Sequence, residues 1–258
     1  LSIRRQRQMC IRDRAERSQM YAEMQSKAHE IISAVVTNIE PVKGIVTLEL
    51  GKGGVATLPR NEQVAGEELR EGQHVKVYVV DVMETERGPR MMISRTHPGL
   101  VKRMFEMEVP EIFDGTVEIK AISREAGART KMAVWSKDEN VDPVGACIGP
   151  RGQRVANIVE ELGGEKIDIV RWSEDPAQFI SAALSPATVV GVELLEGDTK
   201  SCRVTVPDHQ LSLAIGNKGQ NARLCARLTG YNIDIRPESG YYGEEPPMKK
   251  TPEPAAEE

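Results

Sequence analysis

The stretch Ile148-Gly149-Pro150-Arg151-Gly152-Gln153 decides the fold, because it recurs 67 residues later as Ile215-Gly216-Asn217-Lys218-Gly219-Gln220. Downstream of the two loops, Ile167-Asp168-Ile169 matches Ile233-Asp234-Ile235 at nearly the same spacing. Self-similarity of this kind indicates two copies of one structural unit. Strand patterns before and after each loop, with helix patterns around it, predict an α+β unit of roughly 65–80 residues.

Helix signals flank both loops. Asp142 followed by Pro143 is typical of an N-cap and a first helical residue, and Asp208 is expected to cap the second copy in the same way. After each loop, apolar residues recur at helical spacing and are expected to face the core. They are Val155, Ile158, Val159 and Leu162 in the first copy and Ala222, Cys225 and Ala226 in the second.

The glycines of the repeated loop call for a chemical explanation. Glycine lets the backbone approach a ligand without a Cβ in the way, and both loops place one cation, Arg151 or Lys218, between two glycines. Each loop leads into a helix N-terminus, where free N–H groups and the helix dipole attract anions. A single loop of this type is more simply a tight turn. Its repetition in the same frame favours a site for consecutive phosphates.

Five strand patterns precede the repeated part of the chain. Five short strands in about 65 residues suit a small barrel of the OB type, because closure of the sheet hides its edges. Gly51-Lys52-Gly53-Gly54 lacks the spacing of a Walker loop and is interpreted as a hairpin turn. The expected strands are Ile31–Ile39, Ile45–Leu50, Gly54–Leu58, His74–Val82 and Arg90–Ser94.

The two ends of the chain differ in composition from its body. Leu1 to Met20 is rich in arginine without clear periodicity, and Arg14 to Glu30 favours helix. From Glu238 onward the chain is acidic and rich in proline, which is typical of disorder. The expected parts are an N-terminal remnant with a connecting helix (1–29), a barrel (30–96), two α+β domains (97–180 and 181–237) and a disordered acidic tail (238–258).

Composition excludes several classes of protein. A net charge of −5 and a pI near 5.6 argue against coating of nucleic acid by bulk charge, but they allow local basic sites. The four cysteines and four histidines are scattered without zinc-ligand spacing, so no metal or cofactor is expected, and the thiols suggest a cytosolic protein. The chain has no membrane-spanning apolar run and no nucleophile–base arrangement. A non-enzymatic monomer is expected.

The two glycine loops resemble those of KH domains, in which a GxxG loop holds a single-stranded backbone of about four nucleotides. The order of helix, two strands, helix pair and strand is similar to the bacterial, type II form. The whole chain resembles the NusA family of bacterial transcription factors, with an S1-like OB barrel followed by two KH domains. The matching stretches are Ser94–Leu100, Val109–Ile112, Asp114–Ile119, Val141–Gly149, Gly164–Ile169, Ala183–Ala187 and Asp208–Gly216.

The resemblance implies a noncatalytic factor that binds nascent single-stranded RNA and modulates pausing, termination and antitermination by RNA polymerase. RNA, the polymerase and other transcription factors are then the expected partners, in the cytoplasm and away from membranes. The implied RNA-binding residues are Gly149, Pro150, Arg151, Gly152, Arg154, Gly216, Asn217, Lys218, Gly219, Asn221 and Arg223.

Two features depart from the family pattern. Of the family's N-terminal domain, which docks on the polymerase, only the connecting helix is expected in this chain, so docking through that domain is not expected of it. S1 domains usually bind RNA on an aromatic platform, but Tyr78 is the only Phe, Tyr or Trp between Ile31 and Arg95. Because stacking contributes roughly 1–3 kcal/mol per base, the barrel is expected to be a weak or auxiliary RNA binder.

Two other functions remain open at this stage. The chain can be read as an accessory part of an RNA-degrading phosphorolytic complex, although such chains carry a catalytic core followed by KH and then S1. A ribosomal protein would also fit the KH unit, but it would normally be far more basic than a pI near 5.6. An assay for phosphate-dependent RNA decay would distinguish the first alternative from a noncatalytic RNA-binding factor, because activity would favour the degrading complex.

Overall fold

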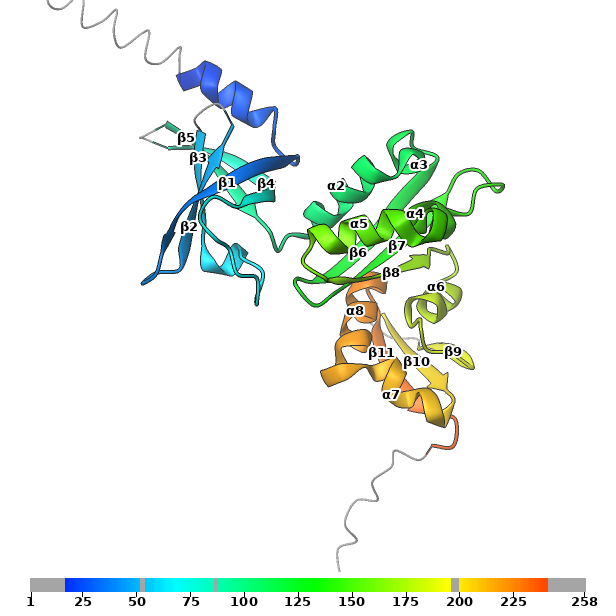
Figure 1. The fold of residues 1–258 in the computed structure, drawn as a ribbon. Coiled ribbons are helices and arrows are strands. Elements are labelled where there is room, and N and C mark those ends of the chain that lie inside the picture. The colour runs from blue at the N-terminus through cyan, green and yellow to red at the C-terminus, as the bar shows by residue number, and fades with distance from the viewer. Residues whose placement is uncertain (1–16, 52–53, 86–87, 196–199, 241–258) are drawn as a thin grey trace, which may run out of the picture. The chain divides into compact units, whose positions relative to one another are not determined.

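The structure is a computed structural model, and it describes residues 17–51, 54–85, 88–195 and 200–240. The chain divides into two compact units, Leu1–Trp172 and Ser173–Glu258. The first unit holds a five-stranded barrel and the first α+β module, and the second unit holds the second α+β module (Figure 1).

The barrel is an antiparallel sheet with the strand order β3-β2-β1-β4-β5. Strands β3 and β5, at the two ends of this order, contact each other, so the sheet curls into a nearly closed barrel (Figure 1). Register shifts in β1 and β4 bend these long strands, as closure of a small barrel requires. The strands are β1 (Ile31–Glu40), β2 (Ile45–Leu50), β3 (Gly54–Leu58), β4 (His74–Thr85) and β5 (Gly88–Ser94), with a 3₁₀ turn η1 (Arg60–Glu62) after β3.

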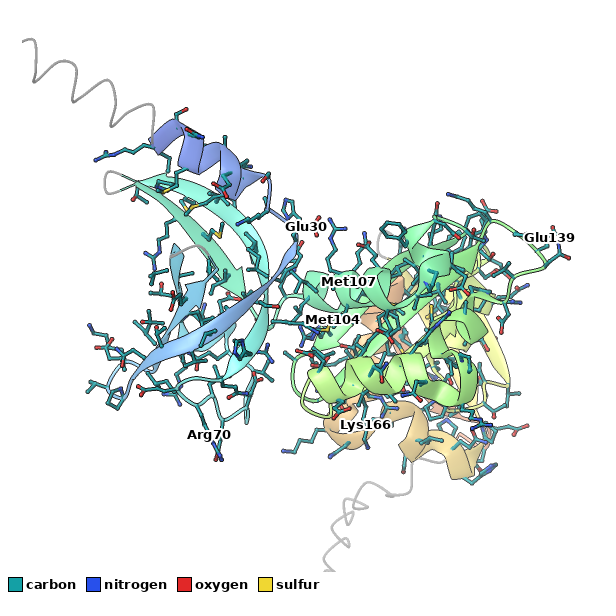
Figure 2. The ribbon with its side chains drawn as sticks, turned by 45° about the horizontal axis from the view of Figure 1, so that its top comes forward. Glu30, Arg70, Met104, Met107, Glu139 and Lys166 are labelled. Atoms are coloured by element: carbon teal, nitrogen blue, oxygen red, sulfur yellow. The ribbon has the colours of Figure 1, made fainter. Side chains whose placement is uncertain are left out.

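Alternating side chains from all five strands fill the barrel interior (Figure 2). Leu48, Leu58 and Val77 are completely buried there. Residues 17–25 form a helix, and its Tyr21 and Met24 pack against this core. Aliphatic side chains therefore build the barrel core. The turn expected at Gly51–Gly54 joins the antiparallel strands β2 and β3, although Lys52 and Gly53 lie outside the described residues, as do the arginine-rich start and most of the acidic tail.

The first α+β module has a three-stranded sheet in the order β6-β7-β8. Strands β6 and β7 are antiparallel, and β8 is parallel to β7 because a helix pair connects them. The helices and the sheet enclose one apolar core that includes Leu100, Phe105, Met132 and Ile158. The elements are α2 (Pro98–Glu108), α3 (Pro110–Phe113), β6 (Val117–Glu125), β7 (Arg129–Ser136), α4 (Pro143–Ile148), η2 (Pro150–Gly152), α5 (Gln153–Glu161) and β8 (Lys166–Arg171).

The second module repeats this topology, with β10 antiparallel to β9 and parallel to β11. Its elements are α6 (Pro176–Ala183), β9 (Gly191–Leu195), β10 (Ser201–Val206), η3 (Asp208–Gln210), α7 (Leu211–Ile215), η4 (Asn217–Gly219), α8 (Gln220–Thr229) and β11 (Asn232–Pro237). The boundary expected between residues 180 and 181 falls inside α6. This helix packs on α8 within the second unit, which begins at Ser173.

Two buried arrangements join the barrel to the first module. Arg124 pairs with Glu165, and its Nη1 donates to the carbonyl oxygens of Arg95 (2.9 Å) and His97 (3.0 Å) in the linker after β5. Tyr78 is buried, and its ring stacks on that of His97 at a centroid distance of 4.8 Å. The only aromatic residue between Ile31 and Arg95 therefore packs in this junction and provides no exposed platform.

Candidate nucleic-acid interface

The two glycine loops have the same backbone conformation. Gly149 lies at φ 74°, ψ 177° and Gly216 at φ 75°, ψ 176°. Two positions later, the basic residue of each loop has a left-handed backbone conformation. Arg151 lies at φ 54°, ψ 23° and Lys218 at φ 50°, ψ 30°. An L-residue adopts this conformation at a cost of roughly 1–2 kcal/mol. Two copies with different sequences around the loop thus keep the same strained turn.

The two glycines of each loop serve different purposes. A Cβ on Gly149 would lie 2.6 Å from Cγ of Arg154, and a Cβ on Gly216 would lie 2.8 Å from both the backbone N and Cβ of Asn221. A Cβ on Gly152 would meet no atom within 4 Å. A Cβ on Gly219 would lie 3.4 Å from Nη1 of Arg223, the far end of a flexible side chain. The first glycine of each loop therefore allows close internal packing, whereas the second supplies a left-handed turn, with open space beside it at Gly152.

The loops combine positive charge with helix N-termini. Arg151 and Lys218 are exposed, and α5 and α8 begin directly after the second glycine of each loop. Within the described residues, no side chain caps the N-terminus of either helix. Because uncapped N–H groups and the helix dipole both favour negative charge, each loop is suited to a phosphate group.

The helix before the first loop starts as the sequence predicts, but its counterpart does not. Asp142 accepts hydrogen bonds from the backbone N–H groups of Val144 and Gly145, so it caps α4. Asp208 does not cap α7, because the 3₁₀ turn η3 precedes that helix. Its Oδ1 instead accepts a hydrogen bond from the backbone N–H of Ser239, 3.0 Å away. The expectation of a second Asp cap was wrong.

Two of the predicted RNA-binding residues hold the loops from inside. Asn221 is buried, and its Nδ2 donates to the carbonyl oxygens of Leu184 and Ala214. It cannot present its side chain to RNA, so its assignment is corrected. Arg154 packs on Gly149 and donates from Nη1 to Glu111 (2.9 Å) and to the carbonyl oxygen of Ala146 (2.6 Å). Both residues are thus placed to support the loop.

The other predicted residues lie at the loop surface. Pro150 and Asn217 are exposed beside their cations. Arg223 is exposed and donates from Nη1 to the carbonyl oxygen of Lys218, 2.5 Å away. Its side chain therefore lies against the backbone of the second loop. With the four glycines and the two cations, they remain the predicted contacts to RNA.

Sequence reasoning missed one pair of residues. Ile148 and Ile215 directly precede the loops, and each leaves 37% of its surface exposed. An exposed isoleucine at the same place in both copies offers an apolar contact for a ribose or a base beside the phosphate site. The signal was present in the repeated hexapeptides, in which isoleucine is the first residue of both.

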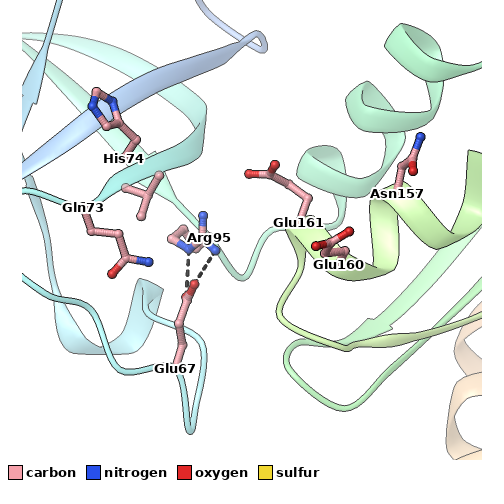
Figure 3. Close-up of a pocket in the computed structure, with 8 residues that line it drawn as sticks. Glu67, Gln73, His74, Arg95, Asn157, Glu160 and Glu161 are labelled. Atoms are coloured by element: carbon pink, nitrogen blue, oxygen red, sulfur yellow. Dashed lines mark hydrogen bonds and ion pairs between the residues drawn. The ribbon is translucent and has the colours of Figure 1, made fainter.

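A hollow of about 420 Å³ between the barrel and α5 differs in charge from the loops. Figure 3 shows Glu160 and Glu161 of α5 on one side of this hollow and Glu67 of the barrel, paired with Arg95, on the other. Lys76 pairs with Glu161 at 3.0 Å. The carboxylates make this hollow less suited to a phosphate group than the loops are.

The described residues show no metal-binding arrangement. No group of three or more His, Cys, Asp or Glu among them is placed to hold a metal ion. Burial raises the pKa of the Cys147 thiol to about 12, so it stays protonated and unreactive at neutral pH. Among the described helices, none has both the length and the apolar character needed to cross a membrane.

Comparison with known protein families divides the chain into three matched regions. Residues 25–94 match the S1 RNA binding domain, residues 95–172 the NusA-like first KH domain, and residues 176–242 the NusA-like second KH domain. These regions agree with the barrel and the two α+β modules. The predicted fold class is confirmed.

Several curated relatives are named "Transcription termination/antitermination protein NusA". The relative from Halalkalibacterium halodurans is 52% identical over 87% of this chain, and that from Bacillus subtilis is 51% identical over 87%. The match covers 58% and 60% of those two proteins, so the chain spans about three fifths of their length. The relative from Mycobacterium tuberculosis is 47% identical over 93% of this chain and 69% of its own length.

Proposed function

Because the chain belongs to the NusA family, we propose that it binds single-stranded RNA through its two GxxG loops and acts in transcription termination and antitermination. The RNA is the nascent transcript, and the place of action is the cytoplasm. RNA polymerase is the proposed protein partner, as the family implies. Binding alone carries the function, and no catalytic step is part of it.

One observation carries the proposal: the same strained loop occurs twice. Arg151 and Lys218 keep the same left-handed conformation and exposure although the residues before them differ. Uncommon backbone conformations persist where the surrounding structure enforces them, and they cluster at ligand-binding sites. Two phosphate sites in one chain suit a continuous polynucleotide better than a mononucleotide, because a polynucleotide occupies both at once.

The RNA-binding role is tested by reversing the charge of both loop cations. Asp is among the residues that tolerate the left-handed region, so Arg151→Asp with Lys218→Asp is expected to leave the fold intact. We expect RNA affinity to fall at least about tenfold, because two charge-assisted phosphate contacts are replaced by repulsion. Fluorescence anisotropy with a labelled single-stranded RNA of mixed sequence measures the change.

The matched control is Lys43→Asp with Arg70→Asp, which makes the same change in net charge at exposed barrel residues. This control should bind RNA nearly as well as the parent. Thermal unfolding should give similar midpoints for all three proteins. If the loop variant binds RNA as tightly as the control, the loops are not the RNA site and the proposal fails.

A further inference from the structure

The first α+β module has an exposed apolar cluster that the proposed function does not use. It lies where α2 ends and α3 begins, on the two helices that follow the barrel (Figure 1). Met107 leaves 71% of its surface exposed and Phe113 leaves 85%, and Pro110 between them is exposed as well. We define these three residues as the apolar patch.

The fold holds the backbone of the apolar patch in place. Val109 and Ile112 are buried in the core of the module and anchor the junction of the two helices. The N–H of Val109 donates to the carbonyl oxygen of Phe105 at 2.9 Å, and the N–H of Phe113 donates to that of Val109 at 3.2 Å. Because the backbone is already ordered, a partner that binds here restricts only side chains, which lowers the entropic cost of docking.

Single exposed apolar residues are ordinary on a protein surface, but an apolar group with a polar rim is typical of an interaction site. Aromatic residues and methionine are enriched in protein–protein interfaces, where buried aromatic side chains often contribute most of the binding energy. Phe113 and Met107 are residues of these types, and both are more than two-thirds exposed. The composition of the apolar patch therefore favours a protein ligand.

Carboxylates surround the apolar patch. Residues 104–114 contain neither lysine nor arginine, and they carry four carboxylates, on Glu106, Glu108, Glu111 and Asp114. Two of the four pair with cations from outside this stretch, Glu106 with Arg103 at 2.6 Å and Glu111 with Arg154 at 2.9 Å. The rim of the patch therefore keeps a surplus of negative charge.

Glu108 and Asp114 carry that surplus. Glu108 accepts a hydrogen bond from Nδ2 of Asn157 at 2.8 Å, and Asp114 accepts one from the N–H of Thr116 at 2.8 Å, so both of these donors are uncharged. Hydrogen bonds from the side chain and the backbone of Thr116 lower the pKa of Asp114, which stays ionised at neutral pH. Both carboxylates are thus suited to pair with a cation of a partner.

We propose that the apolar patch docks a basic, amphipathic segment of a partner protein. Apolar side chains of that segment pack on Phe113 and Met107, and its lysine or arginine side chains pair with Glu108 and Asp114. The inference goes beyond the proposed function, because it assigns a protein-binding surface outside the two GxxG loops.

Charge complementarity selects this occupant over others. RNA or an anionic lipid surface would bring negative charge against the carboxylates of the rim. A twofold contact between copies of this chain would place one acidic rim against another, because both partners of such an interface present the same surface. Like charges that face each other disfavour binding. A basic protein segment matches the patch in both charge and apolar content.

The first test removes the apolar anchors without changing charge. Full-length Met107→Ser with Phe113→Ser is compared with Met20→Ser with Val42→Ser, two exposed apolar residues outside the patch. The probe is a fluorescein-labelled peptide of about 18 residues, with leucine and lysine at helical spacing. By anisotropy, the patch variant should bind it at least about fivefold more weakly than the control variant, because the central anchors of an interface are lost. Thermal unfolding should give similar midpoints for both variants.

The second test removes the negative charge. Glu108→Gln with Asp114→Asn should weaken binding of the same peptide at least about twofold at low salt, and added salt should reduce this difference. The control is Glu68→Gln with Glu84→Gln, which makes the same change in net charge at exposed barrel residues. A peptide with glutamate in place of lysine should bind the parent more weakly than the lysine peptide.

A third test seeks the natural segment. A photoreactive p-benzoylphenylalanine replaces Phe113 in one protein and Val42 in another, and each is irradiated in a bacterial extract before crosslinked peptides are mapped by mass spectrometry. Position 113 should crosslink to basic, apolar segments that position 42 does not reach. A synthetic copy of such a segment should bind the parent and lose affinity for the Met107→Ser, Phe113→Ser variant.

The remaining outcomes count against the proposal. Equal peptide binding by the patch variant and its control, or acidic segments at position 113, would overturn it. A loss of RNA affinity in the patch variant, without loss of peptide binding, would assign the patch to RNA. A parent that sediments as a dimer, with a patch variant that sediments as a monomer, would assign it to self-association. Loss of RNA binding by the loop variant tests the proposed function separately.

Discussion

Arg151 and Lys218 combine a positive charge with a backbone conformation that L-residues seldom adopt. In each loop the N–H of the second glycine donates to the carbonyl oxygen of the first at 3.1 Å, which helps to close the turn. Arg154 supports the first loop from inside, and Asn221 supports the second. The strain is therefore offset by internal contacts, and the cation is left exposed for a ligand.

The two glycines of the first loop should differ in their effect on stability. Gly152→Ala adds only conformational strain at φ 74°, so we expect it to lower the free energy of unfolding by roughly 1 kcal/mol. Gly149→Ala places a Cβ at φ 74°, ψ 177°, a region that only glycine adopts readily, and it also forces this Cβ against Arg154. We therefore expect a further loss of about 1–3 kcal/mol or more. Urea unfolding followed by tryptophan fluorescence measures both.

Gly66→Ala is the control, because Gly66 has φ 88° and open space around its Cβ position. It should resemble Gly152→Ala. Equal losses for Gly149→Ala and Gly152→Ala would show that close packing against Arg154 does not require the first glycine.

At the scale of elements, one buried ion pair connects β6, the start of β8 and the linker after the barrel. The side chains of Arg124 and Glu165 are 1% and 0% exposed, and Glu165 also accepts hydrogen bonds from Oγ1 of Thr130 and the N–H of Gly127. Burial by itself would raise the pKa of Glu165. The hydrogen bonds and positive charge of Arg124, together with the hydrogen bonds from Thr130 and Gly127, outweigh the effect of burial. They lower the pKa of Glu165 below its usual value.

This pair should make the first unit sensitive to acid. A carboxylate with a lowered folded pKa contributes stability above its unfolded pKa, near 4.5, and that contribution is lost as pH falls through the folded pKa. Glu165→Gln should cost about 3–5 kcal/mol at pH 7, because it leaves Arg124 buried without a counterion. It should also remove this part of the acid sensitivity. Urea unfolding between pH 3 and pH 7 is followed through Trp135 and Trp172.

Glu118→Gln provides the control. Hydrogen bonds from Lys120 and Lys137 lower the pKa of Glu118 to about 2, but this carboxylate lies at the surface, where ion pairs contribute little. A Glu165→Gln variant as stable as Glu118→Gln at pH 7 would mean that the buried pair does not hold the barrel and the first module together.

At the scale of the whole molecule, a net charge of −5 coexists with cationic loops. RNA binding should therefore depend on few phosphates. If Arg151, Lys218 and Arg223 each neutralise one phosphate, the slope of log K against log salt should be about −2, since single strands give roughly −0.7 per phosphate. Anisotropy titrations from low to physiological salt measure the slope.

The loop-reversed variant should lose more than half of this slope, because it removes two of the three cations. A parental slope steeper than about −5 would show that many other lysines and arginines contact the RNA. The basic contacts would then extend well beyond the loops.

Local sequence determined much of this molecule. Short β-branched and apolar runs bounded by turn residues predicted the barrel strands closely, because strand propensity and turn signals are local properties of the sequence. The repeated GxxG hexapeptides predicted two equivalent modules, and Asp142 with Pro143 predicted the start of α4, since a cap depends on neighbours two or three residues away. The resemblance to KH domains rests on such local patterns too, and family comparison confirmed it.

Only the tertiary structure decided the burial and the partners of several polar and aromatic side chains. Asn221 is buried against Leu184, Tyr78 packs beside His97, and Asp208 accepts a hydrogen bond from Ser239. Each outcome depends on a partner 19 or more positions away in the chain. A sequence pattern shows periodicity and local caps, but the burial of a polar or aromatic side chain depends on which distant segments fold against it.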